Sequence, residues 1–189
     1  MRIVAGRLKG MKLTEKVSDS TRPTSDKLRE AIFSMLYSRV DLEDSYVADL
    51  YAGTGALGLE AFSRGAQHIV FVETDKKAIN AINENIDEVK KREEILDETF
   101  EILRTPVLTF VKNDGKFGAY DIVFADPPYA HDIETELLSI VAKNGLLVYE
   151  TSAEQLEIAE KTLSSHELVK ELLVSKKFGS SAVIIAQVV

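Results

Sequence analysis

The chain has 189 residues, a formal net charge of -8 and no cysteine. This length suits one ordinary domain, and 45% hydrophobic with 29% charged residues is typical of a folded globular protein. Without cysteine, disulfides, thiolate metal sites and a cysteine nucleophile are excluded, and the three histidines are too scattered to predict a metal site. No apolar run approaches the roughly 20 residues of a membrane-spanning helix and no secretory signal is recognisable, so we expect a cytoplasmic protein.

Charge is distributed unevenly along the chain. Residues 1–29 carry eight basic and three acidic side chains, a net charge of +5, which leaves -13 for the remainder. From charge alone, this end is either a solvated terminus or an arm that binds nucleic acid. Short apolar pieces around Gly6 and Gly10 predict a small hairpin or an extended arm, which we place at residues 1–22 beside a main domain at 23–189. The side chains that would contact nucleic acid in the second interpretation are Arg2, Arg7, Lys9, Lys12 and Arg22.

After Pro23, apolar residues at helical spacing predict a helix that ends near Arg39. From Tyr46 onward, short apolar runs alternate with helical patterns, which indicates a parallel sheet covered by crossover helices. Near the end, strand-like runs at 168–177 and 181–189 are joined without a helix, which predicts an antiparallel hairpin. The fold class is therefore doubly wound α/β, with a mostly parallel seven-stranded sheet closed by this hairpin. The five expected parallel strands are at 47–51, 69–73, 100–104, 121–125 and 146–149.

The first site signal is the sequence DLYAGTGALG at 49–58, which leaves the first expected core strand and enters a helix. Its three glycines form a G-x-G-x-x-G pattern, which permits a tight turn and lets backbone N–H groups approach a ligand. A carboxylate follows about 20 residues later, at the end of the next strand, where it can hold ribose hydroxyls. The pattern predicts a nucleotide-type cofactor site made of Asp49, Tyr51, Ala52, Gly53, Thr54, Gly55, Gly58 and the ribose-binding Glu73.

Asp49 distinguishes between the cofactors that such a turn can bind. It lies four positions before Gly53, on the strand that leads into the turn. A carboxylate there suits the ammonium group of S-adenosylmethionine, whereas the pyrophosphate of a dinucleotide would be repelled. The alternative is that Asp49 only forms hydrogen bonds within the turn. We expect S-adenosylmethionine as the cofactor.

The second signal is Asp126-Pro127-Pro128-Tyr129, directly after the expected strand at 121–125. Two prolines fix two backbone φ angles and remove two donors, so a carboxylate, a carbonyl and an aromatic ring are held in a rigid relation. Ligands bind at the carboxyl ends of strands in such sheets. We therefore expect these four residues to be catalytic, the alternative being an ordinary Pro-Pro turn with an incidental tyrosine.

The chemistry that this group suits is methylation of an exocyclic amine of a base. Such an amine is a poor nucleophile, because its lone pair is delocalised into the ring. The Asp126 carboxylate and the Pro127 carbonyl would accept hydrogen bonds from the two N–H groups of the amine and so direct its lone pair at the methyl group of the cofactor. Positioning then does most of the catalysis. Tyr129 can stack on the base, a contact worth roughly 1 to 3 kcal/mol. The lack of cysteine agrees, because methylation at pyrimidine C5 usually needs a cysteine adduct.

With these motifs, the chain resembles the RsmD family of bacterial 16S ribosomal RNA guanine-N2 methyltransferases nearly from end to end. The cofactor and amine-methylation motifs are shared by many methyltransferases, whereas two N-terminal segments indicate this family in particular. The matching residues are Arg2-Ile3-Val4-Ala5-Gly6 with Gly10, Arg22-Pro23-Thr24, Arg29-Glu30-Ala31, the stretch 49–58, Ser63-Arg64-Gly65-Ala66, Phe71-Val72-Glu73 and Asp126-Pro127-Pro128-Tyr129.

The resemblance implies S-adenosylmethionine as methyl donor and a guanine N2 of 16S ribosomal RNA as acceptor, reached in partly assembled small subunits. It also implies a Rossmann-like methyltransferase sheet, and it places Arg22-Pro23-Thr24 near the cofactor cleft, with Thr24 among the cofactor-binding residues. One departure stands out. Where the family commonly has an acidic residue near the adenine, this chain has Thr105-Pro106, and Pro106 has no N–H to donate. We expect a monomer without metal and without a membrane contact.

Other functions are compatible with parts of the pattern. A DNA adenine-N6 or cytosine-N4 methyltransferase could use Asp-Pro-Pro-Tyr, although such enzymes usually carry a target-reading domain for which this chain has no room beyond the basic arm. A protein-glutamine methyltransferase more often has Asn in place of Asp126. A non-catalytic RNA-binding module would explain the arm but would leave both motifs without a role.

Overall fold

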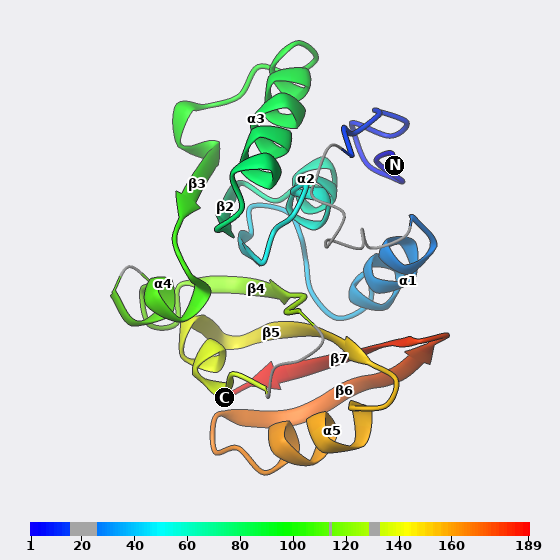
Figure 1. Cartoon of the computed structure of the whole chain (residues 1–189), viewed down its shortest axis with the longest axis vertical. Coiled ribbons are helices and arrows are strands. Elements are labelled where there is room, and N and C mark those ends of the chain that lie inside the picture. The colour runs from blue at the N-terminus through cyan, green and yellow to red at the C-terminus, as the bar shows by residue number, and fades with distance from the viewer. Residues whose placement is uncertain (16–25, 114, 129–132) are drawn as a thin grey trace.

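The computed structural model describes residues 1–15, 26–113, 115–128 and 133–189. In this part of the chain, one sheet of seven strands has the order β3-β2-β1-β4-β5-β7-β6 (Figure 1). The strands are β1 (Tyr46–Leu50), β2 (His68–Glu73), β3 (Phe100–Arg104), β4 (Tyr120–Ala125), β5 (Val141–Ser152), β6 (Val169–Phe178) and β7 (Ser181–Val188). The helices are α1 (Asp26–Leu36), α2 (Ala56–Ser63), α3 (Lys76–Lys90), α4 (Val107–Asn113) and α5 (Leu156–Ser164), with short 3-10 turns η1 (Asp97–Thr99) and η2 (Thr135–Ile140).

The strand pairing confirms the predicted fold class. Strands β1 to β5 pair in parallel, while β7 is antiparallel to both β5 and β6 and so closes the sheet as a hairpin. Successive strands proceed from β1 to β3 on one side and from β4 onward on the other, so the order reverses between β1 and β4. In open α/β sheets, the crevice at such a reversal is where ligands bind.

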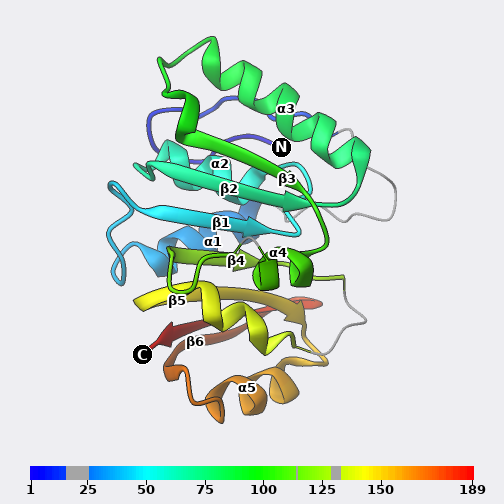
Figure 2. The ribbon, with the colours of Figure 1, turned by 90° about the vertical axis from the view of Figure 1, so that its left-hand side faces the viewer.

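Side chains on each central strand alternate between two apolar layers. On β2, Ile69 and Phe71 belong to the core that packs on α1, α2 and α3, whereas Val70 and Val72 belong to the core on the other face, which includes residues of α4, η2 and α5. Figure 2 shows the sheet between these layers. Because both faces are covered, the central strands are mostly apolar, and this burial explains the short apolar runs in the sequence.

The first residues fold back on themselves against the α1–α3 layer. Arg2 and Lys12 form an antiparallel bridge, and the apolar side chains of this N-terminal hairpin (residues 1–15) are part of the main core; they are Ile3, Leu8, Met11 and Leu13, each at most 5% exposed. Whether residues 1–22 act as a separate unit stays a prediction, because residues 16–25 lie outside the described part. Among the described residues, no helix could span a bilayer and no group of three potential metal ligands occurs.

Candidate cofactor and catalytic site

The turn between β1 and α2 is built from residues with left-handed backbone conformations. Tyr51, Gly53 and Gly55 have φ angles of 58°, 55° and 73°. Gly55 serves as the N-cap of α2, and its N–H donates to the Ala52 carbonyl at 2.7 Å. A Cβ on Gly58 would lie 2.5 Å from the Phe71 ring, so only glycine lets α2 pack this closely on β2. The predicted glycine pattern thus forms the tight strand-to-helix turn, which we call the cofactor turn (residues 51–55).

Two carboxylates accept hydrogen bonds from backbone amides of this turn and of α2. Asp49 accepts a hydrogen bond from the N–H of Gly58 at 2.8 Å, and Glu73 accepts one from the N–H of Gly53 at 2.9 Å. The second oxygen of Glu73 accepts from the backbone N–H groups of Thr74 and Asp75, at 2.7 and 2.9 Å. Since a carboxylate offers about four lone-pair positions, Glu73 can still accept a hydroxyl of a ligand. Asp49 and Glu73 therefore stabilise the turn, and their predicted roles in binding a ligand stay predictions.

The electrostatics of the turn favour a positive ligand. Asp49 is 2% exposed, and burial raises its pKa from the ordinary 3.8 to about 8; the Gly58 amide opposes this increase, while the charges of Asp126 and Glu73 add to it. Three carboxyl groups therefore influence one another at the strand reversal. A cationic group placed among them would relieve both the repulsion and the cost of burying charge.

Asp126 and the two prolines lie where the prediction places them, at the carboxyl end of β4. Leu50 of β1 is level with Ala125 of β4, so Asp126 follows directly beside the cofactor turn. Pro127 is buried, whereas Pro128 is exposed and lines a cavity together with Glu73. The structure thus brings the two motifs together across the strand reversal. Tyr129, Arg22 and Thr24 lie outside the described residues, so their predicted roles stay predictions.

The cavity between the ends of β2, β3 and β4 has a volume of about 250 Å³. The residue that departs from the family pattern, Pro106, is part of its wall. Sequence reasoning missed Glu134, which accepts a hydrogen bond from the phenol of Tyr51. Burial and this carboxylate raise the pKa of Tyr51 well above its ordinary value of 10.0. The lining residues are Tyr51, Val72, Glu73, Thr74, Thr105, Pro106, Val107, Leu108, Pro128 and Glu134.

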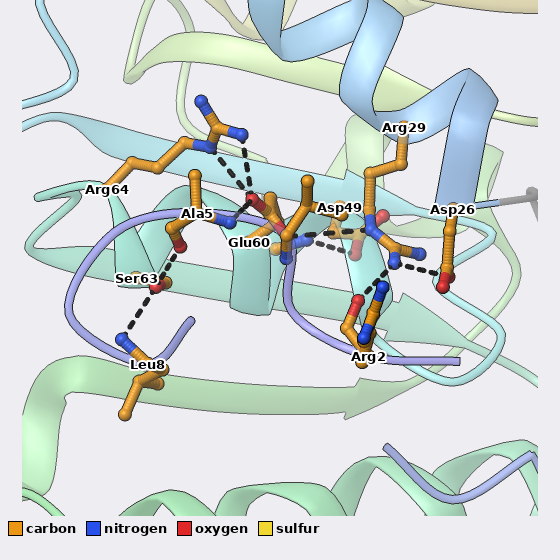
Figure 3. Close-up of polar contacts among 11 residues, drawn as sticks. Arg2, Ala5, Leu8, Asp26, Arg29, Asp49, Glu60, Ser63 and Arg64 are labelled. Atoms are coloured by element: carbon orange, nitrogen blue, oxygen red, sulfur yellow. Dashed lines mark hydrogen bonds and ion pairs between the residues drawn. The ribbon is translucent and has the colours of Figure 1, made fainter. Parts of the chain in front are cut away.

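The N-terminal hairpin is attached to α2 by a buried carboxylate (Figure 3). Glu60 accepts hydrogen bonds from the N–H groups of Val4 and Ala5, at 2.7 and 3.0 Å. Two guanidinium groups balance its charge: Arg64 at 2.9 Å and the fully buried Arg29 at 3.6 Å. The sequence analysis did not single out Glu60, because one acidic residue in a helix carries no local signal of a partner 56 positions away.

Arg7, one of the exposed basic side chains of the hairpin, lies at the end of α2 that is far from the cofactor turn. The backbone N–H of Arg7 donates to the Ser63 carbonyl at 2.8 Å, and its guanidinium lies 4.0 Å from the centre of the Phe62 ring. Ser63 ends α2, whereas the cofactor turn precedes it, and an eight-residue helix is about 12 Å long. A groove of about 380 Å³ brings Arg2 and Lys9 beside α1. The RNA-binding role of Arg2, Arg7, Lys9 and Lys12 stays a prediction.

Asn85 of α3 links the hairpin to the cofactor turn. Its side-chain oxygen accepts from the N–H of Thr14 at 2.8 Å, and its side-chain nitrogen donates to the carbonyl of Thr54 at 2.9 Å. Asn85 is only 2% exposed. Both functional groups of one buried amide are therefore satisfied by backbone from two distant segments, which sequence reasoning did not foresee.

Comparison with known proteins identifies the family of this chain. The family model described as conserved hypothetical protein 95 matches residues 1–187. Ribosomal RNA small subunit methyltransferase D of Haemophilus influenzae is 33% identical over 147 residues, 78% of this chain and 73% of that protein. The protein of the same name from Escherichia coli K12 is 31% identical over 150 residues, 79% of this chain and 71% of that protein.

Solved structures extend the similarity over the whole chain. "Putative methyltransferase yhhF from Escherichia coli" has a TM-score of 0.79 and 27% identity, covering 100% of this chain and 97% of that one. A hypothetical protein of Thermus thermophilus has a TM-score of 0.74 and 29% identity, covering 100% of this chain and 99% of that one. The chain therefore belongs to the conserved hypothetical protein 95 family, the RsmD family that its sequence resembles.

Proposed function

We propose that this chain transfers a methyl group from S-adenosylmethionine to the exocyclic N2 amine of a guanine in 16S ribosomal RNA. It acts as a cytoplasmic monomer on partly assembled small subunits. Two relatives named ribosomal RNA small subunit methyltransferase D support the RNA substrate. The match of the family model over residues 1–187 supports carrying this function over to the chain as a whole.

One observation carries the choice of cofactor: Asp49, Glu73 and Asp126 form an acidic cluster around the cofactor turn. S-adenosylmethionine has a cationic sulfonium and an ammonium group, so the cluster fits it, whereas a dinucleotide pyrophosphate would add negative charge. Asp49 would hold the ammonium, Glu73 the ribose hydroxyls, and the backbone of Gly53 and Gly55 the remainder of the amino-acid end. When bound, the cofactor supplies an electrophilic methyl group.

The residues after β4 orient the acceptor. The Asp126 carboxylate and the Pro127 carbonyl accept the two N–H bonds of the guanine amine, which turns the nitrogen lone pair toward the cofactor side of the crevice. Proline at 127 and 128 limits backbone rotation, so this pair of acceptors is fixed before substrate binds. Tyr129 stacks on the extruded base. Catalysis thus depends on positioning and on the electrostatics of Asp126.

Nucleoside analysis tests this function. Transcribed 16S RNA, small subunits that lack the modification, and duplex DNA are each incubated with the protein and isotopically labelled S-adenosylmethionine, then digested and analysed by mass spectrometry. We expect labelled N2-methylguanosine from RNA or subunits. N6-methyladenine or N4-methylcytosine from DNA would instead establish the DNA alternative. Binding of RNA without any labelled nucleoside would leave the non-catalytic RNA-binding module.

A further inference from the structure

The cavity beside the cofactor turn is suited to one end of a ligand. Its volume of about 250 Å³ is below the roughly 300 to 1,000 Å³ of sites that enclose a whole small molecule. Glu73, the proposed ribose ligand, forms one side, and Val72, Val107 and Leu108 contribute apolar surface. If the cofactor is S-adenosylmethionine, as proposed above, the group that extends from the ribose into this space is the adenine.

Two features of the cavity restrict how the adenine edge can be recognised. Pro106 cannot donate a backbone hydrogen bond, because it has no N–H. Glu73 already accepts hydrogen bonds from three backbone N–H groups, and its remaining capacity is assigned to the ribose. The other carboxylate that lines the cavity is Glu134, at the start of η2.

Tyr51 holds Glu134 in place. The Tyr51 phenol donates to Oε2 of Glu134, and Tyr51 itself is fixed in the cofactor turn with a φ angle of 58°. A carboxylate accepts several hydrogen bonds at once, so a second donor can reach Glu134 while the phenol stays bound. Both residues are partly buried, where a charge-assisted hydrogen bond is stronger than in water.

We propose that Glu134 makes the site selective for adenine by accepting a hydrogen bond from its exocyclic 6-amino group, with Tyr51 as the residue that positions the carboxylate. A purine with a 6-oxo group would present an acceptor to the same carboxylate and would be repelled. This inference rests on the proposed cofactor, and it assigns recognition of the adenine to Glu134 at the start of η2 rather than to the segment after β3.

Binding calorimetry with two ligands tests the inference: S-adenosylhomocysteine and its inosine counterpart, in which a 6-oxo group replaces the amine. We expect the wild-type protein to favour the adenosine form by about 10- to 100-fold. Glu134→Ala should weaken binding of the adenosine form by a similar factor and leave the inosine form unchanged or tighter. Tyr51→Phe should reduce the preference by about 2- to 10-fold, because the carboxylate is less well oriented.

Three further variants make the result decisive. Glu134→Gln can donate an N–H to the 6-oxo group, so this variant should shift the preference toward the inosine form. It keeps the inference testable if thermal unfolding shows that Glu134→Ala is poorly folded. Glu136→Gln changes an exposed residue of the same turn and should behave as wild type. Loss of the preference in Thr105→Val, but not in the Glu134 variants, would overturn the inference and assign recognition to Thr105. Failure of the wild type to bind either ligand would instead overturn the proposed cofactor.

Discussion

The two ends of α2 use the same device for different purposes. At its start, two carboxylates accept hydrogen bonds from backbone N–H groups of the cofactor turn and of α2. Glu73 accepts from Gly53, and Asp49 accepts from Gly58. Toward its end, Glu60 accepts the N–H groups of Val4 and Ala5 and so holds the N-terminal hairpin. Each carboxylate satisfies donors that would otherwise be costly to bury.

The difference lies in the charges around them. Glu60 is completely buried between Arg29 and Arg64, so its charge is balanced within the protein. Asp49 is as deeply buried but has the carboxylates of Asp126 and Glu73 near it, which help to raise its pKa. A neutralised cluster stabilises the fold by itself, whereas an acidic one is suited to a cationic ligand. Glu60 is therefore a structural carboxylate, whereas Asp49 is suited to bind a cationic ligand.

The largest expected effect follows from removing the structural charge. Glu60→Gln should lower the free energy of unfolding by about 3 to 5 kcal/mol, because it removes the buried counterion of Arg29 and leaves this guanidinium only the partly exposed Asp26. Asp49→Asn keeps an acceptor for Gly58 and removes the cost of holding this carboxyl protonated in the folded state, so it should not lower the free energy of unfolding. Urea unfolding of both variants checks this. Glu88→Gln, which breaks an exposed ion pair with Arg92, is the matched control and should leave stability nearly unchanged. Equal losses of stability in the Glu60 and Asp49 variants would contradict the difference in role between these two carboxylates.

The next effect concerns the acidic cluster as a catalytic device. Asp126→Ala should reduce the single-turnover rate of methyl transfer by about 100- to 1,000-fold, the range for removing one positioned polar group that acts in the transition state. Affinity for S-adenosylhomocysteine and thermal stability should stay close to wild type. Rapid-quench measurements with labelled cofactor give the rate. A rate within a few-fold of wild type would show that amine orientation does not depend on Asp126.

Local patterns in the sequence predicted most of the fold, whereas the roles of the site residues stay predictions. The expected strand at 69–73 lies within β2 (His68–Glu73), and the glycine spacing predicted the cofactor turn, because both depend on neighbouring residues only. The order of the strands was not predicted, because a doubly wound pattern is compatible with more than one order. The structure supplies this order, in which β1 and β4 are neighbours and Asp126 lies near Asp49.

The contacts that could not be predicted join distant segments through single side chains. Tyr51 and Glu134 are 83 positions apart, and Thr14 and Asn85 are 71 apart. Neither pair has a periodicity or a motif, since each depends on the exact packing of a loop on the sheet. The prediction of an appended hairpin likewise could not foresee Glu60, whose helix reads as an ordinary apolar one.

A smaller effect should follow at the ribose end of the cluster. Glu73→Ala should weaken binding of S-adenosylhomocysteine about tenfold to over a hundredfold, because it removes charge-assisted hydrogen bonds to the ligand as well as the bond to Gly53. Nicotinamide dinucleotides should bind neither form. Calorimetry measures both affinities, and Glu101→Ala on the exposed part of β3 is a control. Undiminished binding by Glu73→Ala would refute the assignment of the ribose site.

The pH dependence of binding should reveal the state of Asp49. With a pKa of about 8, this carboxyl is mostly protonated in the free protein at pH 6 to 7, and the ammonium of the ligand favours its charged form. Affinity for S-adenosylhomocysteine should therefore rise with pH, by up to about tenfold per pH unit, and level off above pH 8. Proton release should appear in calorimetry as a dependence on the buffer. Asp49→Asn should bind more weakly and without this pH dependence.

The same pKa has the opposite consequence for the stability of the free protein. Because the folded state keeps the Asp49 proton up to a pKa of about 8 while the unfolded chain loses it near the ordinary 3.8, this group makes unfolding progressively easier as the pH rises from about 4 to 8. Urea unfolding at several pH values measures the slope. The part due to Asp49 is the difference between wild type and Asp49→Asn; a difference that stays constant across this window would contradict the raised pKa.

The smallest effect concerns the surface of the N-terminal hairpin. Lys9 and Lys12 are exposed, and within residues 1–15 and 26–113 their side chains take no part in the buried contacts that hold the hairpin, whereas Arg7 packs on Phe62. The double variant Lys9→Gln, Lys12→Gln therefore tests charge without disturbing the packing. If both contact phosphates, the slope of log affinity for RNA against log salt should become shallower by about 1.4 to 1.8. Cofactor affinity should not change.

Filter binding across a salt series, on naked RNA and on partly assembled subunits, measures the slope. Lys161→Gln with Lys170→Gln removes equal charge from exposed sites on α5 and β6; if this control flattens the slope as much as the hairpin variant does, the hairpin is a solvated structural element and the RNA is bound elsewhere.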